Sequence, residues 1–194
     1  MIYQQKKKVL IKFSITVISV LITIILLFSI FAIYQVKGNS MLDSIADGTY
    51  VVVDKSYFGN KKHDFKDIII VKNPSNISFV KRVIGQERDI LKISDQGIIK
   101  GDYFIPHDPI FFSIKNDLVS EVAACIEYAN ILYRNVEEVE SIFEFVSENN
   151  SVCTMHIPKG YYFVVGDNPF ESMDSRFWGF IDETQIVGKV IAVF

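Results

Sequence analysis

The sequence has little that would support a metal centre or a disulfide framework. Among its 194 residues are only two cysteines and three histidines. Cys125 and Cys153 lack Cys-x-x-Cys spacing and are too few for a disulfide scaffold, so we favour two separate buried thiols, with a single bridge as the alternative. His63, His107 and His156 lie far apart and outside any His-x-x-x-His or His-Glu motif. We therefore expect no metal and no other cofactor.

Features of nucleotide or nucleic-acid binding are also missing. The chain contains no Gly-x-Gly-x-x-Gly and no phosphate-binding loop. Its formal charge of −3 is unevenly distributed: the first 36 residues hold four lysines and no acid, which leaves 16 Lys and Arg against 23 Asp and Glu in residues 37–194, a formal −7. An acidic folded part without an Arg- or Lys-rich run does not suit a nucleic-acid partner.

One stretch, residues 13–36, lacks charge altogether. A helix of these 24 residues would be about 36 Å long, enough to cross a hydrocarbon core of about 30 Å. A cleavable signal peptide is the alternative, but the run is longer than a signal peptide's apolar region and lacks an Ala-x-Ala exit. The pattern predicts an uncleaved single-pass anchor in residues 1–36 of the chain. The lysines before it would keep the N-terminus in the cytoplasm and place residues 37–194 outside the cell membrane.

Residues 37–194 are sufficient for one domain with its own core. Short β-branched runs, bounded by polar, Gly- or Pro-containing segments, recur along this part of the chain at spacings of about 10–20 residues, which favours a mainly β, antiparallel domain over βαβ units. The runs are residues 50–54, 67–71, 79–84, 90–93, 97–100, 161–165 and 186–194.

The segment 116–147 departs from this pattern. Its apolar residues recur at steps of three and four, and none of the residues between them is Gly or Pro. Asn135, followed three residues later by Glu138, resembles a capping box for a second helix. We expect one or two amphipathic helices inserted in the β domain, lying on the sheet, with a partner-binding surface as the alternative.

With metal chemistry disfavoured, the residues that remain for catalysis are hydroxyl nucleophiles. Ser40 lies in Lys37-Gly38-Asn39-Ser40-Met41, directly after the apolar stretch. A lysine can act as the base for a serine when burial lowers its pKa. Lys81 and Arg82 are neighbours in the apolar strand 79–84, so their side chains alternate in direction and one of them must face inward or lie against something apolar. The alternative for Lys81 is an edge-strand lysine that faces water.

A third cluster, residues 166–179, follows a hydrophobic strand and surrounds the only tryptophan. It combines two Gly, two Asp, Asn, two Ser and Arg. A surface turn rarely needs arginine together with several hydroxyls and acids, and buried Asp and Arg would have to pair. The cluster indicates either the fixed surroundings of a site or a structural ion-paired loop.

These three clusters, in this order after an N-terminal anchor, resemble bacterial type I signal peptidases (peptidase family S26), and most closely the Gram-positive type. The matching stretches are Gly38-Asn-Ser-Met41, Asp67-Ile-Ile-Ile-Val71, Lys81-Arg-Val-Ile-Gly85 and Gly166-Asp-Asn168 through Ser172-x-Asp-Ser-Arg-x-Trp-Gly179. The resemblance implies a transmembrane helix followed by an antiparallel, signal-peptidase/LexA-like catalytic domain. It also implies a serine endopeptidase that removes signal peptides from exported preproteins.

By this resemblance, Ser40 is the nucleophile and Lys81 the general base. Ser172 would hold the lysine amine, and Asp174 with Arg176 would form the ion pair that supports the site.

Two further positions are assigned in the same way. Met41 would line the substrate groove. Gly38 stands where some members carry a serine that donates to the oxyanion, so the backbone N–H of Ser40 would have to serve here.

The chain departs from the family pattern in several turns. Asp43-Ser44 stand where Pro-Thr is usual, Gly48-Thr49 where Gly-Asp is common, Gln86-Glu-Arg-Asp89 where Pro-Gly-Asp is usual, and Pro169-Phe170 where Arg-Asp is common. These changes remove no catalytic group, but they leave loop geometry and substrate preference open.

The expected partners are the lipid bilayer and signal peptides with small residues at the first and third positions before the cut. Contact with the secretion machinery is a further option. Two other functions remain open: a dedicated maturase of one precursor class, and a catalytically silent, anchored homologue that binds a partner. The anchor excludes a cytosolic self-cleaving repressor.

Overall fold

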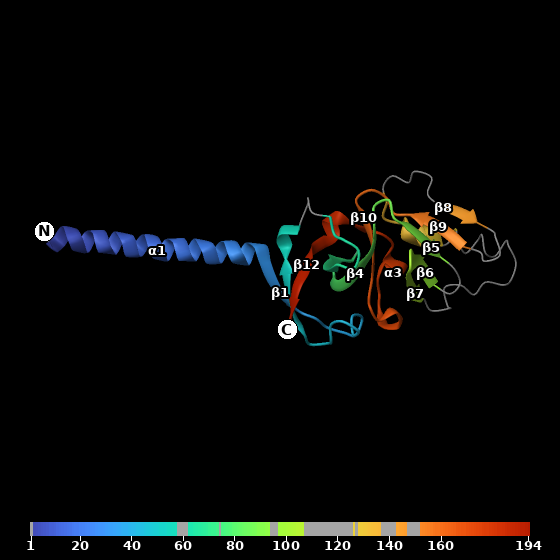
Figure 1. Cartoon of the computed structure of the whole chain (residues 1–194), viewed down its shortest axis with the longest axis horizontal. Coiled ribbons are helices and arrows are strands. Elements are labelled where there is room, and N and C mark those ends of the chain that lie inside the picture. The colour runs from blue at the N-terminus through green and yellow to red at the C-terminus, as the bar shows by residue number, and fades with distance from the viewer. Residues whose placement is uncertain are drawn as a thin grey trace.

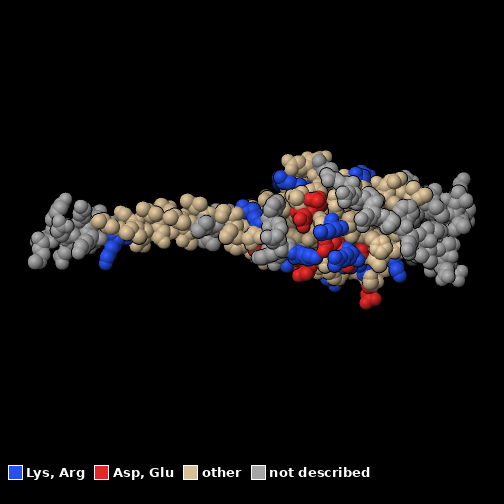
Figure 2. Space-filling view, turned by 90° about the horizontal axis from the view of Figure 1, so that it is seen from above, with Lys and Arg blue, Asp and Glu red and all other residues tan. Residues whose placement is uncertain are grey.

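The structure, a computed structural model, describes residues 2–57, 62–73, 75–93, 97–106, 126, 128–136, 143–146 and 152–194. Helix α1 (Ile2–Ile30) extends away from a β-rich body, and the C-terminus of the chain lies near the base of this helix (Figure 1). Figure 2 shows charged side chains gathered on the body and few of them on the part of α1 that is not drawn in grey. Within the part of the chain that the structure describes, no helix is both long and apolar enough to span a membrane.

The predicted apolar helix ends earlier than residue 36. The chain leaves α1 at Ile30, and strand β1 (Phe31–Gln35) pairs with strand β2 (Tyr50–Asp54), so that Ile33 lies opposite Val52. Aromatic and β-branched residues favour strands where a partner strand is available, and β2 supplies one. The predicted domain boundary between residues 36 and 37 therefore falls after the first strand of the sheet.

The described strands form two antiparallel sheets, as the sequence predicts. The larger has the order β1, β2, β12 (Ile186–Val193), β3 (Ile68–Lys72), β4 (Ser78–Gln86), β10 (Tyr161–Val165) and β11 (Ile181–Asp182). The smaller has the order β7 (Tyr103–Pro106), β6 (Gly97–Lys100), β5 (Ile90–Ile93), β9 (Val152–His156) and β8 (Phe143–Val146). It lies at the end of the body that is far from α1 (Figure 1).

The prediction of one or two helices over residues 116–147 is wrong at the C-terminal end of this segment. Residues 126 and 128–132 are helical, but residues 143–146 form β8, paired antiparallel with β9. Residues 143–145, Phe-Glu-Phe, also alternate with period two, and β9 offers the segment a backbone partner, so the longer helical periodicity was misleading. Residues 116–125, 127, 137–142 and 147 lie outside the described residues.

Asn135 is the predicted start of a second helix, whose further residues 137–142 lie outside the described ones. It lies in a turn after the first one, where its amide Nδ2 donates to the carbonyl of Trp178 at 3.0 Å. Its predicted partner, Glu138, is outside the described residues.

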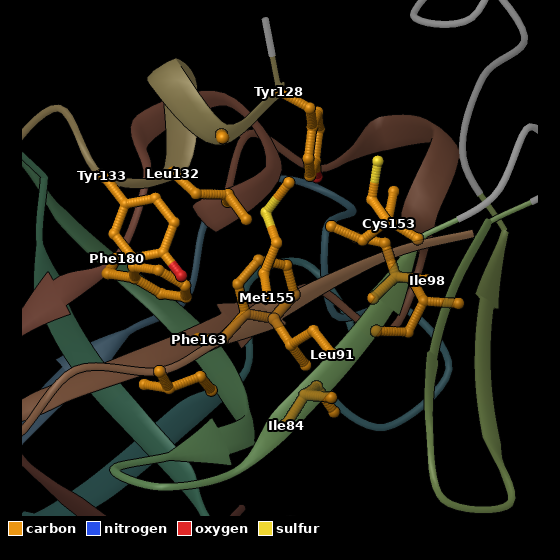
Figure 3. Packing of buried hydrophobic residues seen from close by; sticks show 14 of the residues in the cluster. Ile84, Leu91, Ile98, Tyr128, Leu132, Tyr133, Cys153, Met155, Phe163 and Phe180 are labelled. Carbon is orange, nitrogen blue, oxygen red and sulfur yellow. The ribbon is translucent and has the colours of Figure 1, made fainter. Parts of the chain in front are cut away.

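The described part of the helical segment lies on the sheets. Leu132 and Tyr133 point toward Phe180 and Met155 in a buried cluster that joins the two sheets (Figure 3). The rings of Tyr133 and Phe180 meet edge to face, 5.1 Å apart. This is the packing role predicted for the segment.

Cys153 of β9 is disulfide-bonded, so the prediction of two separate thiols is wrong. The other cysteine of the chain, Cys125, lies outside the described residues. The spacing of the cysteines in the sequence cannot decide whether they form a bridge, because a bridge depends on which segments the fold brings together.

Candidate active site

Ser40 and Lys81 meet although they are 41 residues apart in sequence. Ser40 is in the turn after β1, Lys81 is in the middle of β4, and Ser40 Oγ lies 2.9 Å from Lys81 Nζ. This is the hydrogen-bond distance required between a nucleophile and its base.

Lys81 is fully buried, so the alternative of a lysine that faces water is wrong. Arg82 takes the opposite face of the strand, as alternation requires. Burial lowers the pKa of Lys81 from 10.5 to about 8; the Asp174 carboxylate acts in the opposite direction, and Arg176 lowers the pKa further. Burial therefore raises the share of neutral amine near physiological pH far above that of an exposed lysine.

Apolar groups form much of the wall around the lysine. The Phe79 ring centroid is 5.5 Å from Lys81 Nζ, and the same ring packs on Trp178 with centroids 4.9 Å apart. Across the sheet, Lys81 lies opposite Ile69 of β3, which is also fully buried. Strand pairing and aromatic packing thus hold the amine in a dry place.

The predicted ion pair is present and buried. Arg176 Nε and Nη2 donate to the two carboxylate oxygens of Asp174, both at 2.8 Å. Asp174 also caps helix α3 (Ser175–Trp178) and accepts from the backbone N–H of Gly166 at 3.0 Å. Arg176 donates further to the carbonyl of Pro169 at 2.7 Å. Because both charges are paired and hydrogen-bonded, the cluster can remain charged without water.

Ser172 is buried beside this pair. Its hydroxyl donates to Asp174 Oδ2 at 2.7 Å, and among the described residues no hydrogen bond joins it to Lys81. Gly166 explains how closely the segments pack: a Cβ added there would lie 2.3 Å from Ser172 Oγ and 2.4 Å from the Ser40 carbonyl oxygen. The structure therefore places both hydroxyl residues against one glycine, and the role of Ser172 toward the amine stays a prediction.

Met41 and Gly38 occupy different surroundings. Met41 has no exposed surface and belongs to an apolar cluster with Ile45, Val51 and Ile70, so the structure places it in the core and not along an open groove. Gly38 is exposed, with a φ of +88°, a backbone region that favours glycine.

Sequence reasoning missed a second polar cluster, formed by Arg82, Asp167 and Ser44. Arg82 Nε and Nη2 donate to the two carboxylate oxygens of Asp167 at 2.6 and 2.5 Å. The Ser44 hydroxyl donates to Asp167 at 2.5 Å and accepts from Arg82 at 2.9 Å. Arg82 lies on β4, Asp167 in the loop that follows β10, and Ser44 in the turn that carries Ser40. The sequence contained a signal for this cluster. Arg82 has to face away from Lys81, and a guanidinium that is largely buried needs a carboxylate partner.

This cluster also accounts for one departure from the family pattern. Ser44 stands where threonine is usual, and it supplies a hydroxyl to Asp167. The substitution keeps the polar group and loses only a methyl. Elsewhere, the described residues contain no group of three or more His, Cys, Asp or Glu side chains that could hold a metal ion.

Comparison with known proteins identifies the family of the chain. The family model described as signal peptidase, peptidase S26 matches residues 9–194. The chain is 33% identical over 182 residues to signal peptidase I T of Bacillus subtilis, covering 92% of this chain and 81% of the relative. It is 30% identical over 179 residues to signal peptidase IB of Staphylococcus aureus, covering 90% and 85%.

A solved structure, a signal peptidase I from Enterococcus faecalis, matches with a TM-score of 0.38 and 24% identity over 69% of this chain and 100% of that one. The family model covers nearly the whole sequence, including every element that carries Ser40, Lys81 and the Asp174–Arg176 pair. The chain belongs to the signal peptidase family, peptidase S26.

Proposed function

We propose that this protein is a type I signal peptidase, a serine endopeptidase that cleaves N-terminal signal peptides from exported preproteins with Ser40 as nucleophile and Lys81 as general base. The observation that carries the proposal is the 2.9 Å approach of Ser40 Oγ to a fully buried lysine amine. The named relatives in Bacillus and Staphylococcus are signal peptidases I and support the same reaction.

In the first half of the reaction, the neutral Lys81 amine takes the hydroxyl proton of Ser40 while Oγ attacks the carbonyl carbon of the scissile peptide. The tetrahedral intermediate then collapses, the C–N bond breaks, and the lysine ammonium gives its proton to the departing amine. With a pKa of about 8, about one tenth of the amine is neutral at pH 7. That fraction is sufficient for general-base catalysis.

In the second half, water replaces the departed amine. Lys81 takes a proton from the water, which attacks the acyl carbon, and Ser40 leaves with the proton returned by the lysine. The backbone N–H of Ser40 is the proposed donor to the oxyanion, because Gly38 has no side chain to offer. An oxyanion donor is worth about 10²–10³ in rate in other enzymes.

We further propose that α1 anchors the protein in the cell membrane, with the N-terminus in the cytoplasm and the catalytic domain outside. Ile11, Phe13, Ile15 and Ile25 of α1 are at least half exposed, so the helix shows an apolar surface that nothing in the described chain covers. The lysines near the N-terminus fit the positive-inside rule. The disulfide at Cys153 fits an oxidising compartment.

The anchor supports the choice of substrate. Ser40 follows α1 by ten residues, and the five residues of β1 lie between them. A nucleophile at this position would meet the end of a signal peptide whose apolar part lies in the same bilayer. The partners proposed are therefore preproteins with small residues before the cut and the membrane itself; contact with secretion machinery would be secondary.

The decisive experiment is cleavage of membrane-inserted preproteins by the purified full-length chain in detergent. Ser40→Ala and Lys81→Met should each abolish cleavage, whereas Lys92→Met, at an exposed lysine of β5, should leave it unchanged. Turnover retained by Ser40→Ala or Lys81→Met would refute the assignment. Several preproteins should be compared, because cleavage of only one class would identify a dedicated maturase, and cleavage of none would favour the silent homologue.

A further inference from the structure

Three successive residues that lead to the nucleophile are each held by a different part of the chain. The backbone N–H of Gly38 donates to Asp47 Oδ1 at 2.7 Å. The amide Nδ2 of Asn39 donates to Glu171 Oε2 at 3.0 Å. The carbonyl oxygen of Ser40 accepts from the backbone N–H of Asn168 at 3.0 Å. Two of these contacts depend on exposed carboxylates that play no part in the mechanism above.

Asp47 is a firm support for Gly38. The next residue, Gly48, donates its backbone N–H to Val36 at 2.9 Å, and Val36 donates to Thr49 at 2.8 Å, so the loop end that carries Asp47 is tied to the end of β1. Its carboxylate therefore meets Gly38 from a fixed position. Because Gly38 has a φ of +88°, which few other residues adopt, this hydrogen bond selects one direction for the chain entering the nucleophile turn.

Glu171 belongs to a different segment, the loop that follows β10. It ends the short 3₁₀ helix η3 (Pro169–Glu171) and precedes the buried Ser172. The carbonyl of Pro169 accepts from Arg176 at 2.7 Å, so η3 is attached to the buried Asp174–Arg176 pair. The carboxylate of Glu171 thus connects Asn39 to the segment held by the buried Asp174–Arg176 pair.

We propose that Asp47 and Glu171 are positioning residues for Ser40: by holding Gly38 and Asn39 from two sides, they fix the direction in which Ser40 Oγ faces Lys81 and the substrate carbonyl. The inference rests on the proposed function and deepens it. Among the hydrogen bonds and ion pairs of the described residues, neither carboxylate is paired with the Ser40 hydroxyl or Lys81. A nucleophile must be held to a fraction of an ångström, and small displacements from distant changes reduce rate strongly.

This role differs from simple stabilisation in what it changes. Hydrogen bonds of exposed side chains add little to folding free energy, because water replaces them in the unfolded chain. A positioning contact instead changes turnover after the substrate has bound. Asp47 and Glu171 are not among the groups that set the pKa of Lys81, which are burial, Asp174, Arg176 and Asp167. Their loss should therefore leave the pH profile in place.

The test measures kcat and KM for one preprotein with the full-length protein. Asp47→Ala and Glu171→Ala should each lower kcat by about tenfold, the effect of one well-placed hydrogen bond. KM should stay within about twofold, as should the fraction folded by Trp178 fluorescence. Asp102→Ala, which removes an exposed acid in the turn between β6 and β7, is the matched control and should leave kcat unchanged.

An exchange of groups provides the rescue. Asn39→Asp alone places two carboxylates together and should lower kcat. Adding Glu171→Gln restores a carboxylate–amide hydrogen bond with donor and acceptor reversed, and should recover most of the loss.

Two results would overturn the inference. One is a kcat within twofold of wild type in both alanine variants, and the other is a loss of rate fully explained by a smaller folded fraction. Cleavage that survives Ser40→Ala would instead contradict the proposed function itself, so the two failures are distinguishable.

Discussion

The guanidinium of Arg82 meets the carboxylate of Asp167 with two parallel hydrogen bonds, at 2.6 and 2.5 Å, one residue after the buried Lys81. Asp167 in turn lies between Gly166, which packs on Ser40, and Asn168, whose N–H binds the Ser40 carbonyl. The pair therefore links the strand that carries the base to the loop that holds the nucleophile, on the opposite face of β4 from the reacting atoms.

Arg82→Lys should show how much of the activity depends on this link. Lysine keeps the charge but cannot make two parallel bonds to one carboxylate. We expect kcat/KM to fall by about 10- to 100-fold, since misplacement of either partner slows the reaction. Arg134→Lys is the control, because Arg134 is exposed and donates only to the nearby carbonyl of Ile131 among the described contacts. Equal rates in both variants would contradict a role for the pair.

The pH dependence of activity should report Lys81. Only the neutral amine accepts the proton of Ser40, so kcat/KM should rise with pH and approach a plateau above about 8, the lowered pKa of this lysine. The measurement is kcat/KM over a series of pH values, with a peptide substrate that has no titratable side chains. A profile that is flat from pH 6 to 9 would contradict Lys81 as the base.

Stability should change with pH in the same region and with a definite sign. Since the pKa of Lys81 is about 8 in the folded chain and 10.5 unfolded, the unfolded state binds more protons between these values, and stability rises with pH there. Below pH 8 the buried ammonium costs about 3 kcal/mol. Lys81→Met should therefore raise the free energy of unfolding at pH 7 by up to about 3 kcal/mol, with the difference vanishing near pH 11. Denaturant titrations followed by Trp178 fluorescence measure this difference.

Gly166→Ala tests the close packing between the two serines. The added methyl would lie 2.3 Å from Ser172 Oγ and 2.4 Å from the Ser40 carbonyl. We expect nearly complete loss of cleavage and a stability loss of about 1–3 kcal/mol. Gly97→Ala is the matched control, because its Cβ would lie 2.3 Å from the Ile105 carbonyl in the small sheet. It should destabilise similarly while the folded fraction keeps its activity.

Asp174→Asn should show that the buried pair acts as a unit. The change leaves the Arg176 charge buried without an anion, which costs about 3–5 kcal/mol. Adding Arg176→Met removes the stranded charge and should recover part of that stability without restoring cleavage. Glu183→Gln, at an exposed acid in η4 (Glu183–Gln185), should change neither the stability nor the rate of cleavage. A double variant less stable than Asp174→Asn would contradict this account.

Much of the fold could be predicted because seven of the described strands combine β-branched residues with clear turn signals. The seven predicted runs correspond to β2, β3, β4, β5, β6, β10 and β12 within about two residues at either end. β7, β9 and β11 were not predicted, and β1 and β8 lie in segments that were predicted to be helical. β7 is four residues long and ends in proline, and β11 is only two residues long. A strand that ends in proline or has only two residues gives a weak sequence signal, so its formation depends on its neighbours.

The site was predictable to the extent that motifs specify it. Burial of Lys81 could be argued from its apolar strand, although only the structure shows which of Lys81 and Arg82 faces inward. The Asn39–Glu171 and Ser44–Asp167 hydrogen bonds were beyond reach, because they join segments more than 120 residues apart. A side chain at the surface gives no sequence signal for such a partner.

Helix α1 ends at Ile30 and β1 begins at Phe31, with no linker between them. With α1 in the bilayer as proposed, this direct junction fixes the distance between Ser40 and the membrane surface. A bond presented too near or too far from the lipid stays out of reach of Ser40, whatever its side chains. Selection of the cleavage site would thus depend first on the distance of the scissile bond from the membrane, and only then on the side chains beside that bond.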